Sequence, residues 1–169
     1  TDESSSSFDS MTDSIASNPS LKRYGVAVTH RSGELQAFVT GFGGDNQLLA
    51  WRDEGLRDIT PEPLRDPGTD AIGAAWCDID DDGEEELYVL TTDTYGGQKR
   101  FPDKLYDPVD GGWEELLGGT GVANRFAGRS VACVHSPAGY GFFVARYGGP
   151  VQFIHSVNDS LQDLAPRDG

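Results

Sequence analysis

The stretch AAWCDIDDDGEEELYVL, residues 74–90, places a run of acidic residues around Gly83 between two short apolar segments. Apolar segments of this length, bounded by turn-forming residues, are typical of β-strands rather than helices. A glycine between two such segments supplies the positive φ that a hairpin turn requires. The stretch therefore predicts a β-hairpin with a strongly acidic connecting loop.

The same hairpin pattern occurs twice more in the chain. Gly33 and Gly139 each lie between short apolar segments, at 26–28 and 35–39 in the first case and at 131–134 and 142–145 in the second. A second half-unit with a shared apolar and acidic pattern follows each hairpin: NQLLAWRDEGLRDIT, DKLYDPVDGGWEELL and VQFIHSVNDSLQDLA. Each half-unit reads as another hairpin. Four short strands over roughly 50 residues, repeated three times, are typical of β-propeller blades.

These repeats predict an all-β fold of three four-stranded propeller blades. The expected units are a disordered polar tail at 1–20, then blades at 21–66, 67–122 and 123–169, with the acidic loop in the second blade. Because propellers have about four to eight blades, we expect these three to belong to a larger propeller. An open three-blade stack would leave apolar faces uncovered at both ends, for a second copy or the remaining blades of a longer chain.

The charge of the chain excludes some classes of partner. Its 169 residues include 28 acidic and 13 basic ones, which gives a net charge of −15. A negative field repels nucleic acid and anionic membrane surfaces, so neither is expected as a partner. No apolar run is long enough to span a membrane, and no secretory signal is visible. Scarce lysine beside so many acids is typical of salt-adapted proteins, although an acidic mesophilic surface domain has the same balance.

Two cysteines, Cys77 and Cys133, occupy equivalent positions in different repeats and are flanked by apolar residues. We expect them to be free, buried thiols rather than a disulfide, because buried cysteine behaves as a small apolar residue.

The acidic loop has the spacing of a calcium site. With Asp78 as position 1, acids stand at positions 3, 5 and 9 and the glycine at position 6 permits a sharp turn. Calcium prefers six to eight oxygen ligands, which alternate carboxylates and a backbone carbonyl at position 7 can supply. The predicted ligands of Ca²⁺ are Asp78, Asp80, Asp82, Glu84 and Glu86.

The loop has two other possible interpretations. An EF-hand needs a glutamate at position 12, where Val89 stands inside an apolar segment, so that motif is rejected. A solvated acidic turn is the plainer alternative, since Asp81 and Glu85 fall outside the ligand pattern. We favour calcium, because so many carboxylates would repel one another without a cation. The hairpins around Gly33 and Gly139 lack these acids, so one ion per chain is expected.

The loop, the LYV segment after it and the half-unit DKLYDPVDGGWEELL resemble the FG-GAP/VCBS repeats of integrin-α-type propellers. In particular they are similar to the ASPIC/UnbV, or cartilage-acidic-protein-like, group, over about residues 24–165. The acid-rich, lysine-poor balance suggests a haloarchaeal-type member. The resemblance implies a calcium-stabilised propeller, extracellular or at the cell surface, that contacts proteins or glycans and carries no catalysis. Glu86 replaces the aspartate that usually ends the family's loop.

No constellation of residues indicates an enzyme. His30 and His135 are expected in turns, His155 follows an apolar segment, and no nucleophile elbow is present. Core packing is the expected role of Trp51, Trp76 and Trp113. We therefore expect a non-enzymatic module for protein interaction, adhesion or structural support. The alternatives are a glycan-binding propeller and a scaffold domain of a larger protein.

Overall fold

The computed structural model describes residues 21–166, so the predicted tail at 1–20 lies outside the described part of the chain. Residues 21–166 form three four-stranded antiparallel sheets and one short helix, α1 (Glu62–Arg65). The strands are β1 (Val26–Arg31), β2 (Glu34–Val39), β3 (Gln47–Arg52), β4 (Gly55–Asp58), β5 (Ala71–Cys77), β6 (Glu86–Thr91), β7 (Lys104–Val109), β8 (Gly112–Glu115), β9 (Ala127–Ser136), β10 (Gly139–Tyr147), β11 (Gln152–Val157) and β12 (Ser160–Asp163).

Each sheet is a meander of four consecutive strands, β1–β4, β5–β8 and β9–β12. This confirms the three predicted four-stranded units, and every predicted apolar segment forms part of a strand. Tight turns close the hairpins: Ser32 and Gly33 connect β1 to β2 with φ of 53° and 76°. Asn158 and Asp159 connect β11 to β12 with φ of 49° and 59°. Two consecutive positive φ values match the right-handed twist of the paired strands.

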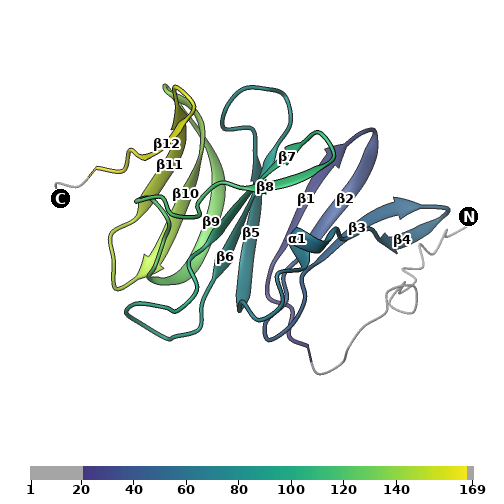
Figure 1. Cartoon of the computed structure of the whole chain (residues 1–169), viewed down its shortest axis with the longest axis horizontal. Helices are drawn as coiled ribbons and strands as arrows, with labels where there is room; N and C mark the ends of the chain where they lie inside the picture. Colours follow the sequence, from purple (N-terminus) through teal and green to yellow (C-terminus); the bar gives the residue numbers. More distant parts are fainter. Residues whose placement is uncertain (1–20, 167–169) are drawn as a thin grey trace, which may run out of the picture.

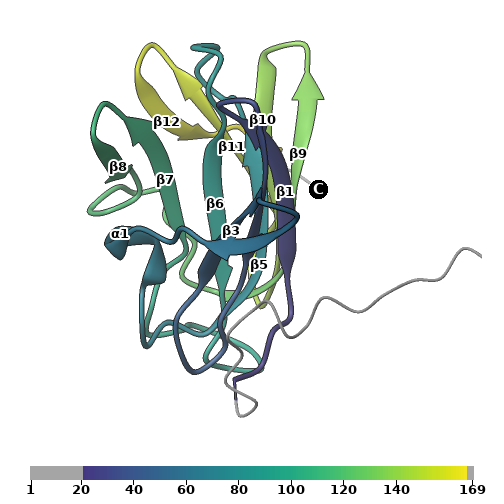
Figure 2. The same cartoon turned by 90° about the vertical axis from the view of Figure 1, so that its right-hand side faces the viewer.

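The three sheets are arranged side by side in sequence order, with the second sheet in the middle (Figures 1 and 2). The first strand of each sheet lies on the inner side, where β5 contacts both β1 and β9. The outer strands β4, β8 and β12 are at the far edges of their sheets. All the hairpin turns that join first to second strands therefore lie at one end of the molecule, and the acidic loop is among them.

The core consists of two apolar layers, one on each face of the second sheet. Tyr88 and Leu90 of β6 pack with Phe142 of the third sheet, whereas Leu87 and Val89 pack on the other side with Phe38 of the first. Every residue of β6 is buried, and burial of one large apolar side chain contributes about 1.5–3 kcal/mol. The strand that follows the acidic loop is therefore the centre of the fold.

The two outer sheets each leave part of one face exposed. On β1 the side chains of Val26 and Val28 are 62% and 55% exposed, while Ala27 between them is buried. On β10 the side chain of Phe143 is 40% exposed, while its neighbour Phe142 is fully buried. This confirms that apolar side chains remain uncovered at both ends of the stack.

The prediction of free thiols is wrong, because Cys77 of β5 and Cys133 of β9 form a disulfide with their Cα atoms 5.3 Å apart. Equivalent positions in successive repeats are far apart in the sequence, but stacking of the repeats brings them side by side on adjacent inner strands. The bond joins the second sheet to the third covalently.

Three smaller expectations also need correction. His30 and His135 lie within strands β1 and β9 rather than in turns, and His155 lies within β11. Trp76 is buried and Trp113 packs against the core between the first and second sheets, as expected. Trp51 is 45% exposed, because its position on β3 faces away from that core. Within residues 21–166, no helix has the length and apolar character needed to cross a membrane.

Reduction of the disulfide is expected to lower the free energy of unfolding. The two cysteines are 56 residues apart in sequence, and closing a loop of that length contributes about 4 kcal/mol by restricting the unfolded chain. Urea unfolding with and without a reducing agent measures the change. The double variant Cys77→Ala/Cys133→Ser is the control and should not respond to the reductant. Identical curves for the oxidised and reduced wild-type chain would contradict this role of the bond.

Candidate metal centre

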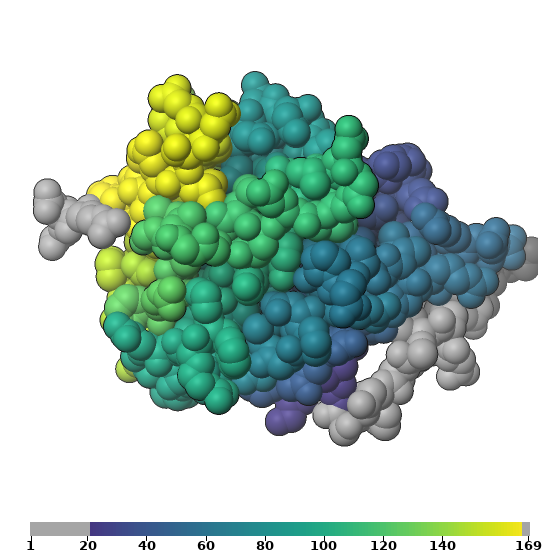
Figure 3. Space-filling model, viewed as in Figure 1, coloured from purple at the N-terminus to yellow at the C-terminus, as the bar shows by residue number. Residues whose placement is uncertain are grey.

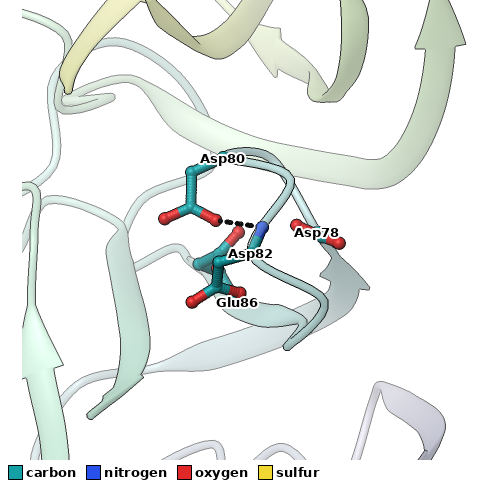
Figure 4. A group of neighbouring side chains, drawn as sticks. All are labelled: Asp78, Asp80, Asp82 and Glu86. Carbon is teal, nitrogen blue, oxygen red and sulfur yellow. Dashed lines mark hydrogen bonds between the residues drawn. The ribbon is translucent and has the colours of Figure 1, made fainter. Parts of the chain in front are cut away.

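The acidic loop connects β5 to β6 and gathers four of the predicted ligands. One carboxylate oxygen from each of Asp78, Asp80, Asp82 and Glu86 can be chosen so that all four lie within 4.8 Å of one another. Figure 4 shows these side chains converging between the turn of the loop and the start of β6. The four acids could hold a metal ion, as their spacing predicted.

Hydrogen bonds within the loop set its curvature. The backbone amides of Asp81 and Gly83 donate to the two carboxylate oxygens of Asp78, at 2.8 and 3.1 Å. The amide of Asp82 donates to Oδ1 of Asp80, and that of Glu84 donates to Oδ1 of Asp82. Gly83 has a φ of 92°, the positive value that its position in the loop predicted. Short acidic side chains that bond the backbone two to five residues ahead favour such a turn.

Glu86 differs from the other three acids because it is buried, with 1% of its surface exposed. Its Oε2 accepts a hydrogen bond from the amide of Ile79 at 2.7 Å. Its Oε1 is buried and has no hydrogen-bond partner. The pKa of Glu86 is raised to about 8, mainly because its carboxylate is buried and also because the carboxylates of Asp80 and Asp107 are near.

A second buried carboxylate provides a contrast. Asp103 is fully buried, yet its oxygens accept hydrogen bonds from the Tyr88 hydroxyl, the Thr91 amide, the Asn124 side chain and the ammonium group of Lys99. Buried polar groups almost always have such partners, and an exception calls for an explanation such as an ion or water. The bare Oε1 of Glu86 is such an exception, and Glu86 belongs to the group of four acids that could hold a metal ion.

Two further acids of the loop point toward the first sheet. Glu84 forms an ion pair with Arg31 of β1 at 3.2 Å, and the hydroxyl of Thr29 donates a hydrogen bond to Glu85. The carboxylate of Glu84 is thus outside the cluster, which leaves only its backbone carbonyl for the predicted role as a ligand. That role stays a prediction. Glu85 also lies outside the cluster, as the spacing of the ligands indicated.

The ligand set consists of oxygen atoms only, which suits hard cations such as Ca²⁺ rather than metals that prefer nitrogen or sulfur. The loop is at the surface beside the turn between β11 and β12 (Figure 3). A cavity of about 420 Å³ separates the loop from the third sheet and is lined by Asp80, His135, Tyr140 and Asp159 among others. The acidic loop therefore forms one wall of this cavity.

Sequence reasoning missed one acid near this cluster. Asp107 of β7 lines a neighbouring cavity together with Asp80. Asp107 is far from the loop in the sequence, and only the pairing of β6 with β7 brings it close. The segment YDPV contains this acid, but its place near the loop follows only from the register of the strands.

The chain is similar to cartilage acidic protein 1 over most of its length. It is 38% identical over 164 residues to the protein of Xenopus tropicalis, a match that covers 83% of this chain and 25% of that protein. It is 37% identical over 172 residues to the human protein, which covers 88% of this chain and 26% of the relative. The chain thus spans about a quarter of the length of the curated relatives it matches.

These proteins are homologues of the chain, in agreement with the resemblance to the cartilage-acidic-protein-like group. No family model matches the chain. The assignment to FG-GAP/VCBS repeats and the haloarchaeal origin therefore stay predictions.

In the presence of a chelator, the stability of the wild-type chain is expected to fall as the pH rises from 4.5 to about 8. The folded chain retains a proton on Glu86 over this range, whereas the unfolded chain releases it near 4.5, so rising pH favours the unfolded state. Urea unfolding at several pH values measures the slope.

In the same experiment, Glu86→Gln should reduce this fall by on the order of 1–3 kcal/mol, because it removes the group that titrates. Glu54→Gln, in an exposed hairpin turn, is the matched control and should keep the wild-type slope. Equal slopes for all three proteins would contradict the burial of an unpaired carboxylate at this position.

Proposed function

We propose that the chain is a calcium-binding segment of a β-propeller that serves as a non-enzymatic module for protein interaction or structural support. The bare, buried Oε1 of Glu86 beside three converging aspartates carries the metal part of this proposal. Calcium suits the site because it accepts carboxylate and carbonyl oxygens in flexible geometry, whereas Mg²⁺ needs a stricter octahedron. The ion would join the end of β5 to the start of β6.

The propeller part of the proposal rests on the arrangement of the sheets. Three four-stranded meanders with their first strands side by side on the inner face are typical of consecutive propeller blades. The apolar faces of β1 and β10 at the two ends of the stack are surfaces that further blades or a second copy would cover. A match to only a quarter of each relative is in keeping with a propeller that continues beyond these three sheets.

An extracellular or cell-surface location is part of the same proposal. The disulfide between Cys77 and Cys133 favours an oxidising compartment. The names of the relatives place an acidic protein in cartilage. A protein partner at the cell surface suits the non-enzymatic module proposed here.

Calcium is expected to raise the thermal unfolding midpoint of the chelator-treated chain. An ion at a hundred times its dissociation constant adds about 2.7 kcal/mol of stability. Asp80→Asn should abolish this response because it removes a carboxylate of the cluster. Asp81→Asn is the matched control: it removes a charge from the same loop but outside the cluster, and should leave the response intact. An equal response in both variants, or none in the wild-type chain, would refute the site.

Glycan binding is the second candidate, favoured by the cavity between the acidic loop and the third sheet. Tyr140 is 49% exposed and stands beside acidic side chains in that cavity, a combination suited to a sugar ring and its hydroxyl groups. Calcium-dependent binding on a glycan array, lost in Tyr140→Ala but kept in Tyr95→Ala, is the expected result. Absence of any calcium-dependent glycan binding would remove this candidate.

A further inference from the structure

Asp107 faces the acidic cluster from the neighbouring strand. β6 and β7 are antiparallel, with Leu87 opposite Tyr106 and Tyr88 opposite Leu105. Continuing this register by one residue places Glu86 opposite Asp107, so that the two side chains lie on the same face of the sheet. A cavity of about 520 Å³ is lined by both Asp80 and Asp107, which places the two acids on one hollow.

Oδ1 of Asp107 is buried and has no hydrogen-bond partner. Among the residues at 21–166, only Glu86 and Asp107 have a buried carboxylate oxygen in this state. Two such oxygens on adjacent strands at the same cluster have a common explanation if a hydrated cation lies between them.

Arg31 is the protein cation that could provide another explanation. Its guanidinium group lies 4.8 Å from the ring centre of Trp113, on the strand next to Asp107. However, the ion pair that it forms is with Glu84, at 3.2 Å. One of its nitrogens, Nη1, is buried without a partner, so a direct pair between Arg31 and Asp107 is the competing arrangement that an experiment must separate.

We propose that Asp107 positions the calcium ion from outside the loop by accepting a hydrogen bond from a water molecule bound to the ion. The inference rests on the calcium site proposed above. Asp107 is absent from the group whose ligand atoms lie within 4.8 Å of one another, which favours contact through water over direct coordination. Four carboxylates and one carbonyl leave room for water among the six to eight ligands of calcium.

An acid in this role affects affinity without touching the metal. Outer partners orient bound ligands, and their removal typically weakens metal binding 10–100-fold. Through this water, Asp107 would also link the ion to β7. The metal would then connect the first hairpin of the sheet, β5–β6, with the second, β7–β8.

Titration of the chelator-treated chain with Ca²⁺ by calorimetry, for the wild type, Asp107→Asn and Glu114→Gln, tests the proposal. Glu114 is opposite Asp107 on β8 and is exposed, so its variant controls for the loss of one nearby charge. The expected result is a dissociation constant 10–100-fold higher for Asp107→Asn and nearly unchanged for Glu114→Gln. Equal affinity in the two variants would overturn the proposal, whereas a wild-type chain that binds no calcium would instead refute the metal site itself.

Unfolding in chelator separates the competing role of Arg31. If Asp107 serves the hydrated ion, Asp107→Asn should keep or exceed wild-type stability without calcium, because it relieves repulsion among the acids. A loss of stability that is the same with and without calcium, or a failure to fold in chelator, would show that Asp107 pairs with Arg31 and would overturn the proposal. Asp107→Ser, which is smaller and also uncharged, provides a second variant for both measurements.

Discussion

The placement of a carboxylate at the edge of the core is the constraint on which the rest of this structure depends. Glu86 is the first residue of β6, the strand that is buried along its whole length, and its own side chain is as buried as those of the apolar residues that follow. A buried carboxylate with one oxygen that lacks a hydrogen-bond donor is costly. The three aspartates before it raise that cost unless a cation is present, because like charges oppose ionisation. The burial of β6 at its first residue therefore depends on what compensates the charge of the acidic loop.

The middle sheet, which carries the acidic loop, is connected to both of its neighbours. Its two faces carry the two apolar layers of the molecule, and the disulfide fixes its inner strand to that of the third sheet. On the other side, the pairs of Arg31 with Glu84 and Thr29 with Glu85 connect the loop to the first sheet. An ion that orders the loop would thereby also order the contact between the first and second sheets.

Much of the fold was predictable because the signal is repeated. Three copies of a unit made of two hairpins predicted all twelve strands and the turn at Gly83, and the spacing of four acids predicted which side chains converge. The disulfide and Asp107 were missed for one reason: both depend on which segments are adjacent in space. Equivalent cysteines meet only when repeats stack, and Asp107 meets Glu86 only through the register of β6 and β7. The spacing of residues within one loop reveals neither of these contacts.

A crystal structure of the chain grown with calcium, with anomalous differences measured at long wavelength, tests the central claim most directly. The account predicts one anomalous peak within bonding distance of Asp78, Asp80, Asp82 and Glu86, with Oε1 of Glu86 among the ligands. Calcium crystals with no peak at the loop, and with Oε1 of Glu86 bonded instead to a protein donor, would contradict it.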